Sequence, residues 1–296
     1  MNGKPFVKWA GGKGQLIAQL DDLLPADFAE RRDLVYVEPF VGGGAMLFHV
    51  LTKYPNVKRA VINDLNADLV TCFRTVRDEP DELIARLRAL QAEYAGCGDE
   101  TARRALFLDK RERYNSRNAK GAETAALFIF LNRTCFNGLY RVNSRGVFNV
   151  PFGKAVRPCI CNEETIRADS ALLRKVEIRC GDFTCAADGV GGGAFFYFDP
   201  PYRPLTRTAA FTAYSKDGFD DGEQKRLADF CRTLDAAGQT WLLSNSDPHN
   251  ADPDDSFFEE LYGGFDVRRV SASRMINSKA GGRGPISELA IRNYKE

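Results

Sequence analysis

Histidine is scarce in this chain of 296 residues, which holds only His49 and His249. Eight cysteines are present, and a single residue separates the only close pair, Cys159 and Cys161. Zinc ligands in a local pair are normally separated by about two to four residues, so this pair does not have the spacing of a zinc site. The sequence therefore predicts no metal site, and the thiols are interpreted as buried or idle side chains.

Long hydrophobic runs are also missing. No run approaches the ~18 apolar residues that a membrane-spanning helix needs, and no apolar stretch of signal-peptide type follows residues 1–5. The sequence shows no internal repeat and no low-complexity tract. With 44% hydrophobic and 27% charged residues, it predicts a cytoplasmic globular protein of one large domain or two modest ones.

The net charge of +1 hides an uneven distribution of charge along the chain. Residues 101–160 hold twelve Lys or Arg and three Asp or Glu, so this segment carries about +9 and the remainder about −8. A basic block of this size is typical of a surface that binds nucleic acid. Residues 103–120 also have a polar helical pattern, so a solvated helix face explains the charge equally well at this stage.

Short apolar segments alternate with helical ones through most of the chain. Strands are predicted at 34–37, 59–64, 175–178, 193–198, 240–243 and 289–291, and helices at 45–51, 65–76 and 223–237. This alternation predicts an α/β fold with a doubly wound, Rossmann-like sheet. The charged helical stretch 78–121 and the stretch 132–153, interpreted as a hairpin or loop, interrupt the alternation and are expected to form an insertion.

Acidic residues stand at the ends of three predicted strands, namely Glu38, Asp64 and Asp199. Ligands of open α/β sheets bind beyond the carboxyl ends of the strands, so these side chains are candidates for one crevice. The glycine turn 40–44, from Phe40 to Gly44, follows Glu38 and lets a ligand approach the backbone closely. It lacks the wider glycine spacing of a dinucleotide fingerprint. Because a strand-end carboxylate such as Asp64 can accept hydrogen bonds from ribose hydroxyls, the pattern favours a nucleoside cofactor without a pyrophosphate.

The segment Asp199-Pro200-Pro201-Tyr202 is the most specific chemical motif. The two prolines fix their φ angles and remove two backbone donors, which leaves carbonyl oxygens at the end of a buried strand. An aromatic amine could donate one N–H to the Asp199 carboxylate and the other to the Pro200 carbonyl. Tyr202 offers a face on which a flipped base can stack. An ordinary Pro-Pro turn after a strand is the alternative interpretation.

Several motifs together resemble the Dam-type DNA adenine methyltransferases. They occur in the family's order and span nearly the whole chain: 6–13 (FVKWAGGK), 38–45 (EPFVGGGA), 63–66 (NDLN), 132–153 with its Asn- and Gly-rich hairpin, and 199–202 (DPPY). The resemblance implies a Rossmann-like methyltransferase that transfers a methyl group from S-adenosylmethionine to the exocyclic amine of adenine in double-stranded DNA, with GATC as the expected site. It divides the chain into a cofactor-binding catalytic domain, residues 1–66 and 165–296, and an inserted DNA-recognition domain, residues 67–164.

The resemblance also implies roles for particular residues. Catalysis is expected from Asp199, Pro200, Pro201 and Tyr202. The cofactor is expected to contact Trp9, Lys13, Glu38, Phe40, Gly42, Asp64, Asp182, Phe183 and Asp199. DNA is expected to contact Lys8, Arg133, Phe136, Asn137, Arg141 and Asn143. The family pattern has Tyr at position 136, so Phe136 keeps the stacking surface without the hydroxyl. Arg141 is expected to contact guanine, whereas Arg111, Arg113 and Arg117 are expected to contact phosphates or solvent.

Two other function classes compete with this interpretation. Methyltransferases that act on RNA adenine or on a protein amide often carry Asn at the position of Asp199 and lack the basic hairpin insertion. A non-enzymatic nucleic-acid binder on the same scaffold would show decay of the glycine turn or of Asp199, and neither is decayed. We therefore expect a monomeric DNA methyltransferase without a metal, and a cognate restriction endonuclease is a candidate genetic partner.

Overall fold

A computed structural model describes the chain except for residues 1, 10, 12, 13, 15, 206–217, 273–285 and 296, and except for the side chains of 272 and 286. The chain forms two compact units. The first comprises Met1–Gly12, Val41–Pro55 and Asn63–Asp182, and the second comprises Lys13–Phe40, Asn56–Ile62 and Phe183–Glu296. No helix in the described part of the chain is long and apolar enough to cross a membrane.

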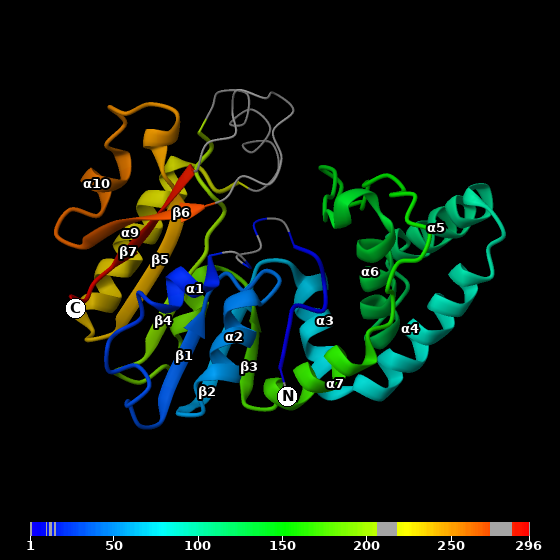
Figure 1. The fold of residues 1–296 in the computed structure, drawn as a ribbon, viewed down its shortest axis with the longest axis horizontal. Helices are drawn as coiled ribbons and strands as arrows, with labels where there is room; N and C mark the ends of the chain where they lie inside the picture. The colour runs from blue at the N-terminus through cyan, green and yellow to red at the C-terminus, as the bar shows by residue number, and fades with distance from the viewer. Residues whose placement is uncertain are drawn as a thin grey trace. The chain divides into compact units, whose positions relative to one another are not determined.

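The strands form a seven-stranded sheet in the order β3-β2-β1-β4-β5-β7-β6 (Figure 1). β1 pairs in parallel with β2 and β4, and β4 pairs in parallel with β5, whereas β7 is antiparallel to β5 and β6. The predicted α/β fold is thus confirmed. Strand order reverses at β1, which is the position where open α/β sheets bind ligands. The bounds are β1 (Leu34–Glu38), β2 (Val57–Asp64), β3 (Val176–Cys180), β4 (Phe195–Phe198), β5 (Thr240–Ser246), β6 (Asp266–Ala272) and β7 (Ile286–Arg292).

The core of the second unit forms around β1, β4 and β5. All four residues of β4 are buried, as expected for a central strand covered on both faces. Val37, Phe196 and Trp241 occupy one register across the three strands and share one apolar cluster. The cluster also includes side chains of α9 (Asp221–Ala236) and α10 (Phe257–Leu261). Short elements complete this unit: α1 (Ile17–Asp21), η2 (Phe183–Ala187) and η3 (Pro248–Asn250).

The first unit is mainly helical. Its helices are α2 (Ala45–Lys53), α3 (Ala67–Asp78), α4 (Pro80–Ala95), α5 (Glu100–Asn115), α6 (Ala122–Thr134) and α7 (Glu163–Leu173). Residues 125–131 of α6 are all buried, because α3, α4 and α5 pack around this helix (Figure 1). Asn66 and Asp99 cap α3 and α5 by accepting backbone hydrogen bonds, and Pro80 begins α4, where its missing N–H costs nothing.

The stretch 132–153 adopts a sparse hairpin. A short 3-10 turn, η1 (Phe136–Gly138), follows α6, and isolated bridges join Cys135 to Phe152 and Val142 to Phe148. Gly153 lies so close to the Cys135 carbonyl that a Cβ at this position would come within 2.2 Å of the carbonyl oxygen. Only glycine therefore fits where the returning chain crosses the end of α6.

Candidate functional site

The end of β4 is fixed by hydroxyl groups within the second unit. Ser244 of β5 donates its hydroxyl to Oδ1 of Asp199 at 3.1 Å, and its Oγ also lies 3.1 Å from the Tyr197 hydroxyl. Burial first, and then the nearby Asp199 carboxylate, raise the pKa of Tyr197. The Asp199 side chain is therefore held in a defined orientation at the carboxyl end of the central strand.

The two prolines after Asp199 are held by a buried amide pair. Gln224 of α9 donates to the Pro201 carbonyl at 3.0 Å and accepts a hydrogen bond from Asn245 of β5 at 3.1 Å. Both amide side chains are fully buried. Among the described residues, the Pro200 carbonyl accepts no hydrogen bond, so one acceptor at the strand end is open to a ligand beside the fixed Pro201 carbonyl.

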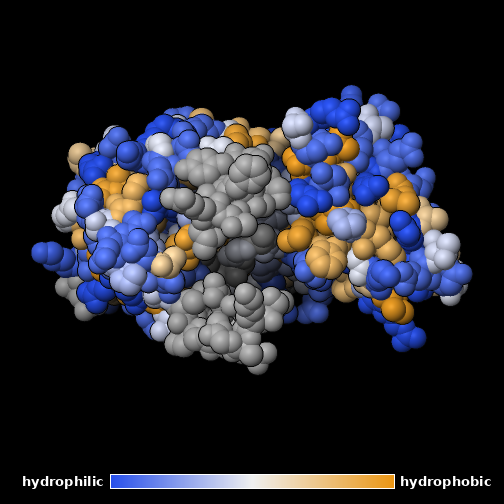
Figure 2. Space-filling view, turned by 90° about the horizontal axis from the view of Figure 1, so that it is seen from above, coloured by the Kyte–Doolittle hydropathy of each residue, from blue (hydrophilic) through white to orange (hydrophobic). Residues whose placement is uncertain are grey.

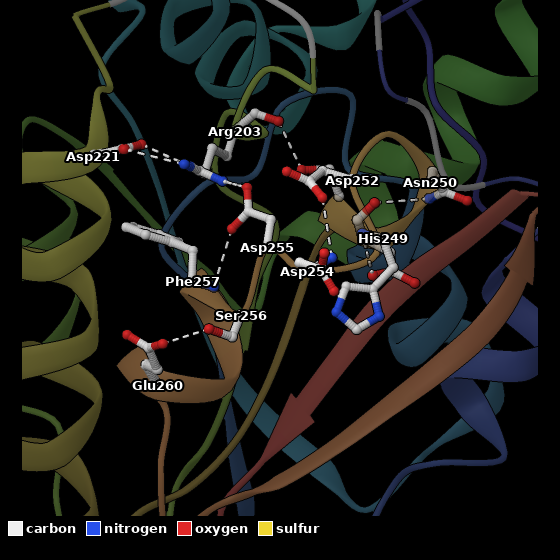
Figure 3. A network of polar contacts seen from close by, with 12 residues as sticks. Arg203, Asp221, His249, Asn250, Asp252, Asp254, Asp255, Ser256, Phe257 and Glu260 are labelled. Atoms are coloured by element: carbon white, nitrogen blue, oxygen red, sulfur yellow. Dashed lines mark hydrogen bonds and ion pairs between the residues drawn. The ribbon is translucent and has the colours of Figure 1, made fainter.

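Arg203 anchors the chain directly after the motif (Figure 3). Its Nε lies 2.9 Å from Asp221 Oδ1, its Nη1 lies 2.7 Å from Asp255 Oδ2, and its guanidinium carbon stands 4.2 Å from the centre of the Phe257 ring. Its backbone N–H donates to Asn245 Oδ1 at 3.2 Å. Arg203, which follows Tyr202, is thus held by two carboxylates from separate parts of the chain and by one aromatic face.

Tyr202 itself is oriented by a carboxylate. Its hydroxyl donates to Glu288 Oε2 of β7 at 2.5 Å. Burial first, and then the carboxylates of Asp199 and Glu288, raise the pKa of Tyr202 well above its ordinary value, so its hydroxyl stays protonated. A ring tied at its hydroxyl end is a rigid surface for stacking.

Three further predicted cofactor residues lie in the second unit. Glu38 is buried and accepts a hydrogen bond from the Tyr36 hydroxyl at 2.8 Å. Burial, followed by the Glu38 charge, raises the pKa of Tyr36. The rings of Phe40 and Phe183 stand 5.3 Å apart. The structure thus brings Phe40 and Phe183 together as an apolar pair.

In the first unit, Asp64 holds the glycine turn. Its Oδ2 accepts the Gly42 N–H at 3.0 Å, and its Oδ1 accepts the Asn66 N–H at 2.9 Å. Burial raises the pKa of Asp64, although these backbone N–H groups oppose the shift. Gly42 has φ +48°, and a Cβ there would lie 2.9 Å from the Trp9 ring. The predicted residues Trp9, Gly42 and Asp64 are therefore neighbours.

For the other two predicted cofactor residues, Asp182 and Lys13, the structure gives fewer contacts. The Asp182 carbonyl is 3.4 Å from the Asn63 amide nitrogen, so the segment 181–182 is tied to the end of β2. Lys13 lies outside the described residues.

The hairpin carries exposed apolar and polar side chains in the first unit. Phe136 is 51% exposed and Leu139 is 39% exposed, so two large apolar side chains stand at the surface within four residues of one another. Asn137 has φ +54°, and a Cβ at Gly138 would lie 2.5 Å from Lys8 Cδ, so the Lys8 stem packs on this turn. Over the same part of the molecule, Figure 2 shows hydrophobic side chains intermingled with hydrophilic ones.

The polar residues predicted to bind DNA differ in how far their hydrogen bonds engage them within the protein. Arg141 is exposed, and its Nε donates to Asn149 Oδ1 across the hairpin at 2.7 Å. Asn143 closes the turn by accepting the N–H groups of Arg145 and Val147. Arg133 donates to the Phe6 carbonyl at 2.7 Å, and burial lowers its pKa. Arg141 is thus presented to solvent, whereas Asn143 and Arg133 also support the fold.

Sequence reasoning missed the residues that hold the motifs in place. Gln224 lies on the same face of α9 as Leu227, Ala228 and Cys231, at the spacing i, i+3, i+4 and i+7 of a buried stripe. An amide in that stripe signals a buried hydrogen-bonding role. Asn132 shows the same pattern in α6: it is buried, its side chain accepts the Lys8 N–H, and it donates to the Lys8 and Gly138 carbonyls.

In the part of the chain that the structure describes, no group of three or more His, Cys, Asp or Glu side chains could hold a metal ion. The residues described above present carboxylates, carbonyls, amides and aromatic faces. An acceptor pair at the end of β4 suits an amine donor, and the glycine turn with Asp64 suits a ligand that carries hydroxyls.

Comparison with known proteins gives consistent matches along the chain. The model of the family described as "D12 class N6 adenine-specific DNA methyltransferase" matches residues 9–276. A protein of Methanocaldococcus jannaschii named Type II methyltransferase M.MjaIII is 45% identical and aligns over 99% of this chain and 100% of its own length. Type II methyltransferase M1.LlaDCHI of Lactococcus lactis subsp. cremoris is 37% identical over 99% of this chain and 96% of its own. The DNA adenine methylase of Escherichia coli (strain K12) is 30% identical over 97% and 94%.

Proposed function

Because this chain belongs to the D12 class N6 adenine-specific DNA methyltransferases, it methylates adenine in DNA, and we propose that S-adenosylmethionine is the methyl donor and GATC the double-stranded target site. Family membership decides against the two competing classes, an RNA or protein amide methyltransferase and a binder without activity.

The Asp199 carboxylate and the Pro200 carbonyl, at the end of β4, carry the catalytic part of the proposal. In it, the adenine amine donates one N–H to Asp199 and the other to the Pro200 carbonyl, which accepts no hydrogen bond from a described residue. Two fixed acceptors orient the amine nitrogen before the reaction, so less freedom is lost in the transition state. Pro201 keeps the backbone in place through Gln224. The base is extruded from the duplex and stacks on Tyr202, at a cost of a few kcal/mol of base stacking.

The chemistry of the donor set fits S-adenosylmethionine. The Asp64 carboxylate accepts backbone N–H groups of Gly42, Leu65 and Asn66. Its two oxygens offer about four acceptor positions, so it can still accept a ribose hydroxyl. Trp9, Lys13, Glu38 and Asp182 are proposed as further contacts, and Phe40 and Phe183 offer apolar faces for an adenine ring. When bound, S-adenosylmethionine supplies the electrophilic methyl group that the adenine nitrogen accepts.

The hairpin is proposed to bind the DNA duplex. Phe136 and Asn137 form an exposed turn that enters the duplex, and Arg141 contacts a guanine in the major groove, where its fork matches two acceptors. Lys8, Arg133 and Asn143 complete the interface. By function, residues 1–66 and 165–296 are proposed as the catalytic domain, and residues 67–164 as the recognition domain.

Two relatives are named type II methyltransferases, so a restriction endonuclease is the proposed genetic partner of this chain. A monomer is proposed because one chain carries both the catalytic motif and the hairpin, and a cytoplasmic location is proposed because its DNA is there.

The proposal is tested by sequencing DNA from a host that lacks adenine methylation and expresses this chain, with a method that detects N6-methyladenine. We expect modified adenine at a single short motif, GATC. Modification confined to a different motif would refute the proposed site but keep the enzyme class, whereas unmodified DNA with a folded, expressed protein would refute the activity.

The role of Asp199 is tested by Asp199→Ala. Loss of a positioned acceptor should cost about 3 kcal/mol of transition-state stabilisation, or about 100-fold in turnover, while DNA binding persists. Asp229→Ala, on the exposed face of α9, is the matched control. Near-normal turnover of the Asp199 variant would remove Asp199 from the site.

A further inference from the structure

Arg117 connects helix α3 to the tip of the hairpin within the first unit. Its Nη1 lies 2.6 Å from Asp68 Oδ2, and its Nη2 donates to the Gly146 carbonyl at 2.9 Å. Arg117 also has φ +58°, a left-handed conformation that costs free energy for a residue with a side chain. Sequence reasoning expected Arg117 to contact phosphates or solvent; its side chain is 47% exposed, and its guanidinium also bonds Asp68 and Gly146.

The hairpin needs such attachments, because a two-stranded hairpin is marginally stable in water by itself. Its base is held by Asn115, which bonds both the N–H and the carbonyl of Phe148. Among the described residues, Arg117 is the one side chain outside the hairpin that bonds the tip, residues 143–146. The position of the tip therefore depends on the Arg117 guanidinium.

Asp68 extends this connection toward the glycine turn. It stands in the first turn of α3, and its N–H donates to Asn66, the residue that caps the helix. Asn66 in turn donates its N–H to Asp64, which holds Gly42. Asp68 also accepts a hydrogen bond from the Tyr114 hydroxyl, so its carboxylate is the common partner of Tyr114 and Arg117.

An aromatic stack runs beside this polar connection. The ring of Tyr140 stands 5.7 Å from Trp9 and 5.2 Å from Phe128, with interplanar angles of 22° and 28°. Its hydroxyl lies 3.5 Å from Asp68 Oδ2. Tyr140 directly precedes Arg141, so the Asp68 carboxylate contacts one end of the hairpin segment 140–146 directly and reaches the other end, Gly146, through the Arg117 guanidinium.

We propose that Asp68 and Arg117 are positioning residues for target-site discrimination, which place the hairpin tip and Arg141 relative to the turn that holds Gly42. This inference rests on the proposed function of the hairpin in DNA binding. It assigns to Arg117 a role in selecting the site without contact to DNA.

The test compares Arg117→Gln with Arg113→Gln. Arg113 is a matched control, because it is as exposed as Arg117 (47% for each side chain) and pairs with Glu123 of α6 and not with the hairpin. For each variant, kcat/KM is measured on a duplex with the site found by sequencing and on duplexes with one base pair of that site replaced. We expect the ratio between intact and altered sites to fall by about tenfold for Arg117→Gln, comparable to the loss of one base contact, and to stay unchanged for Arg113→Gln.

Two additional variants keep the test decisive if Arg117→Gln folds poorly. Arg117→Lys keeps the charge beside Asp68, but one ammonium group cannot bond Asp68 and Gly146 as the guanidinium fork does, so the ratio should also fall. Asp68→Asn should lower it in the same direction. Melting temperature and S-adenosylmethionine affinity without DNA are measured in parallel, because a purely structural role would change stability and lower both rates by one factor.

The outcomes separate the inference from the function on which it rests. If the wild-type enzyme methylates intact and altered duplexes equally, the proposed role of the hairpin in selecting the site is refuted. If the wild-type enzyme discriminates and Arg117→Gln and Arg117→Lys both keep the full ratio, the positioning role is refuted.

Discussion

At the scale of single residues, Asp64 and Asp199 have different hydrogen-bond partners. Asp64 accepts backbone N–H groups and fixes the glycine turn, whereas Asp199 accepts a hydroxyl from Ser244. Removing the Asp64 carboxylate therefore removes a support of the turn together with the proposed ligand contact.

Asp64→Ala should weaken S-adenosylmethionine binding by more than the loss of one hydrogen bond, which is about 1 kcal/mol or fivefold in Kd. Asp64→Asn keeps one carbonyl oxygen and should weaken binding less. Isothermal titration calorimetry measures both. An unchanged Kd in the alanine variant would place the ribose contact at another residue.

Arg141→Ala should relax the choice of target site. The bond from Arg141 to Asn149 orients its guanidinium on an exposed face, and an Arg–guanine pair discriminates by about 1–3 kcal/mol. Methylation of a site altered at one guanine should therefore rise relative to the intact site, measured at one fixed salt concentration. Equal loss on both duplexes would show that Arg141 contacts the DNA backbone.

The sequence could predict residues whose chemistry is visible locally. The segment 199–202, the glycine turn and Asp64 stand out by composition, and the structure places Trp9, Gly42 and Asp64 next to one another. The supports of the motif could not be predicted, because Gln224 and Asn245 meet only through the pairing of distant segments. For the same reason, the sequence did not show that Arg117 and Asp68 are partners.

At the scale of elements, the segment after Tyr202 depends on contacts from several parts of the second unit. Asp221 stands at the start of α9, Asp255 precedes α10, and Asn245 belongs to β5, so Arg203 draws three elements to one point (Figure 3). The carboxyl end of β4 and the bounds of α9 were predicted closely because their apolar patterns are strong. Helix α7 and strand β6 were not, since neither has a strong local signal.

Arg203→Gln should lower turnover about tenfold or more while changing the KM for DNA little. The reason is that a loosened Tyr202 orients the base less well after binding. Arg232→Gln is the control, because Arg232 pairs with Asp229 on the exposed face of α9. A rise in KM without a change in turnover would assign Arg203 to DNA binding instead.

At the scale of the whole molecule, one buried carboxyl makes stability depend on pH. Asp169 of α7 is fully buried, and its Oδ1 accepts the Lys4 N–H at 3.0 Å, which ties the N-terminal segment to the first unit. Burial raises the pKa of Asp169 from 3.8 to about 8, although Lys4 opposes the shift. The folded protein thus binds a proton that the unfolded chain releases, and this contribution to stability falls as pH rises from about 4 to 8.

Asp169→Asn should remove this contribution, since the amide does not ionise. The free energy of unfolding is measured by urea unfolding for the variant and the wild type. The value for the variant minus the value for the wild type should increase steadily between pH 5 and pH 8. Asp81→Asn, at an exposed carboxylate on α4, is the control and should show no such trend. A difference independent of pH would mean that Asp169 does not titrate in this range.

The sparse hairpin has a consequence for how the protein can change. Residues 139–148 form one isolated bridge. Asn115, outside the segment, bonds both backbone groups of Phe148, and the buried Asn132 bonds the Gly138 carbonyl directly before the segment. Most of their hydrogen bonds to the segment go to backbone atoms, so many hairpin sequences can use the same anchors. Under the proposed role of the hairpin in site selection, site preference can diverge among descendants by substitutions in these ten residues while the catalytic scaffold stays constant, and exchange of this segment between relatives is a practical route to methyltransferases with new sites.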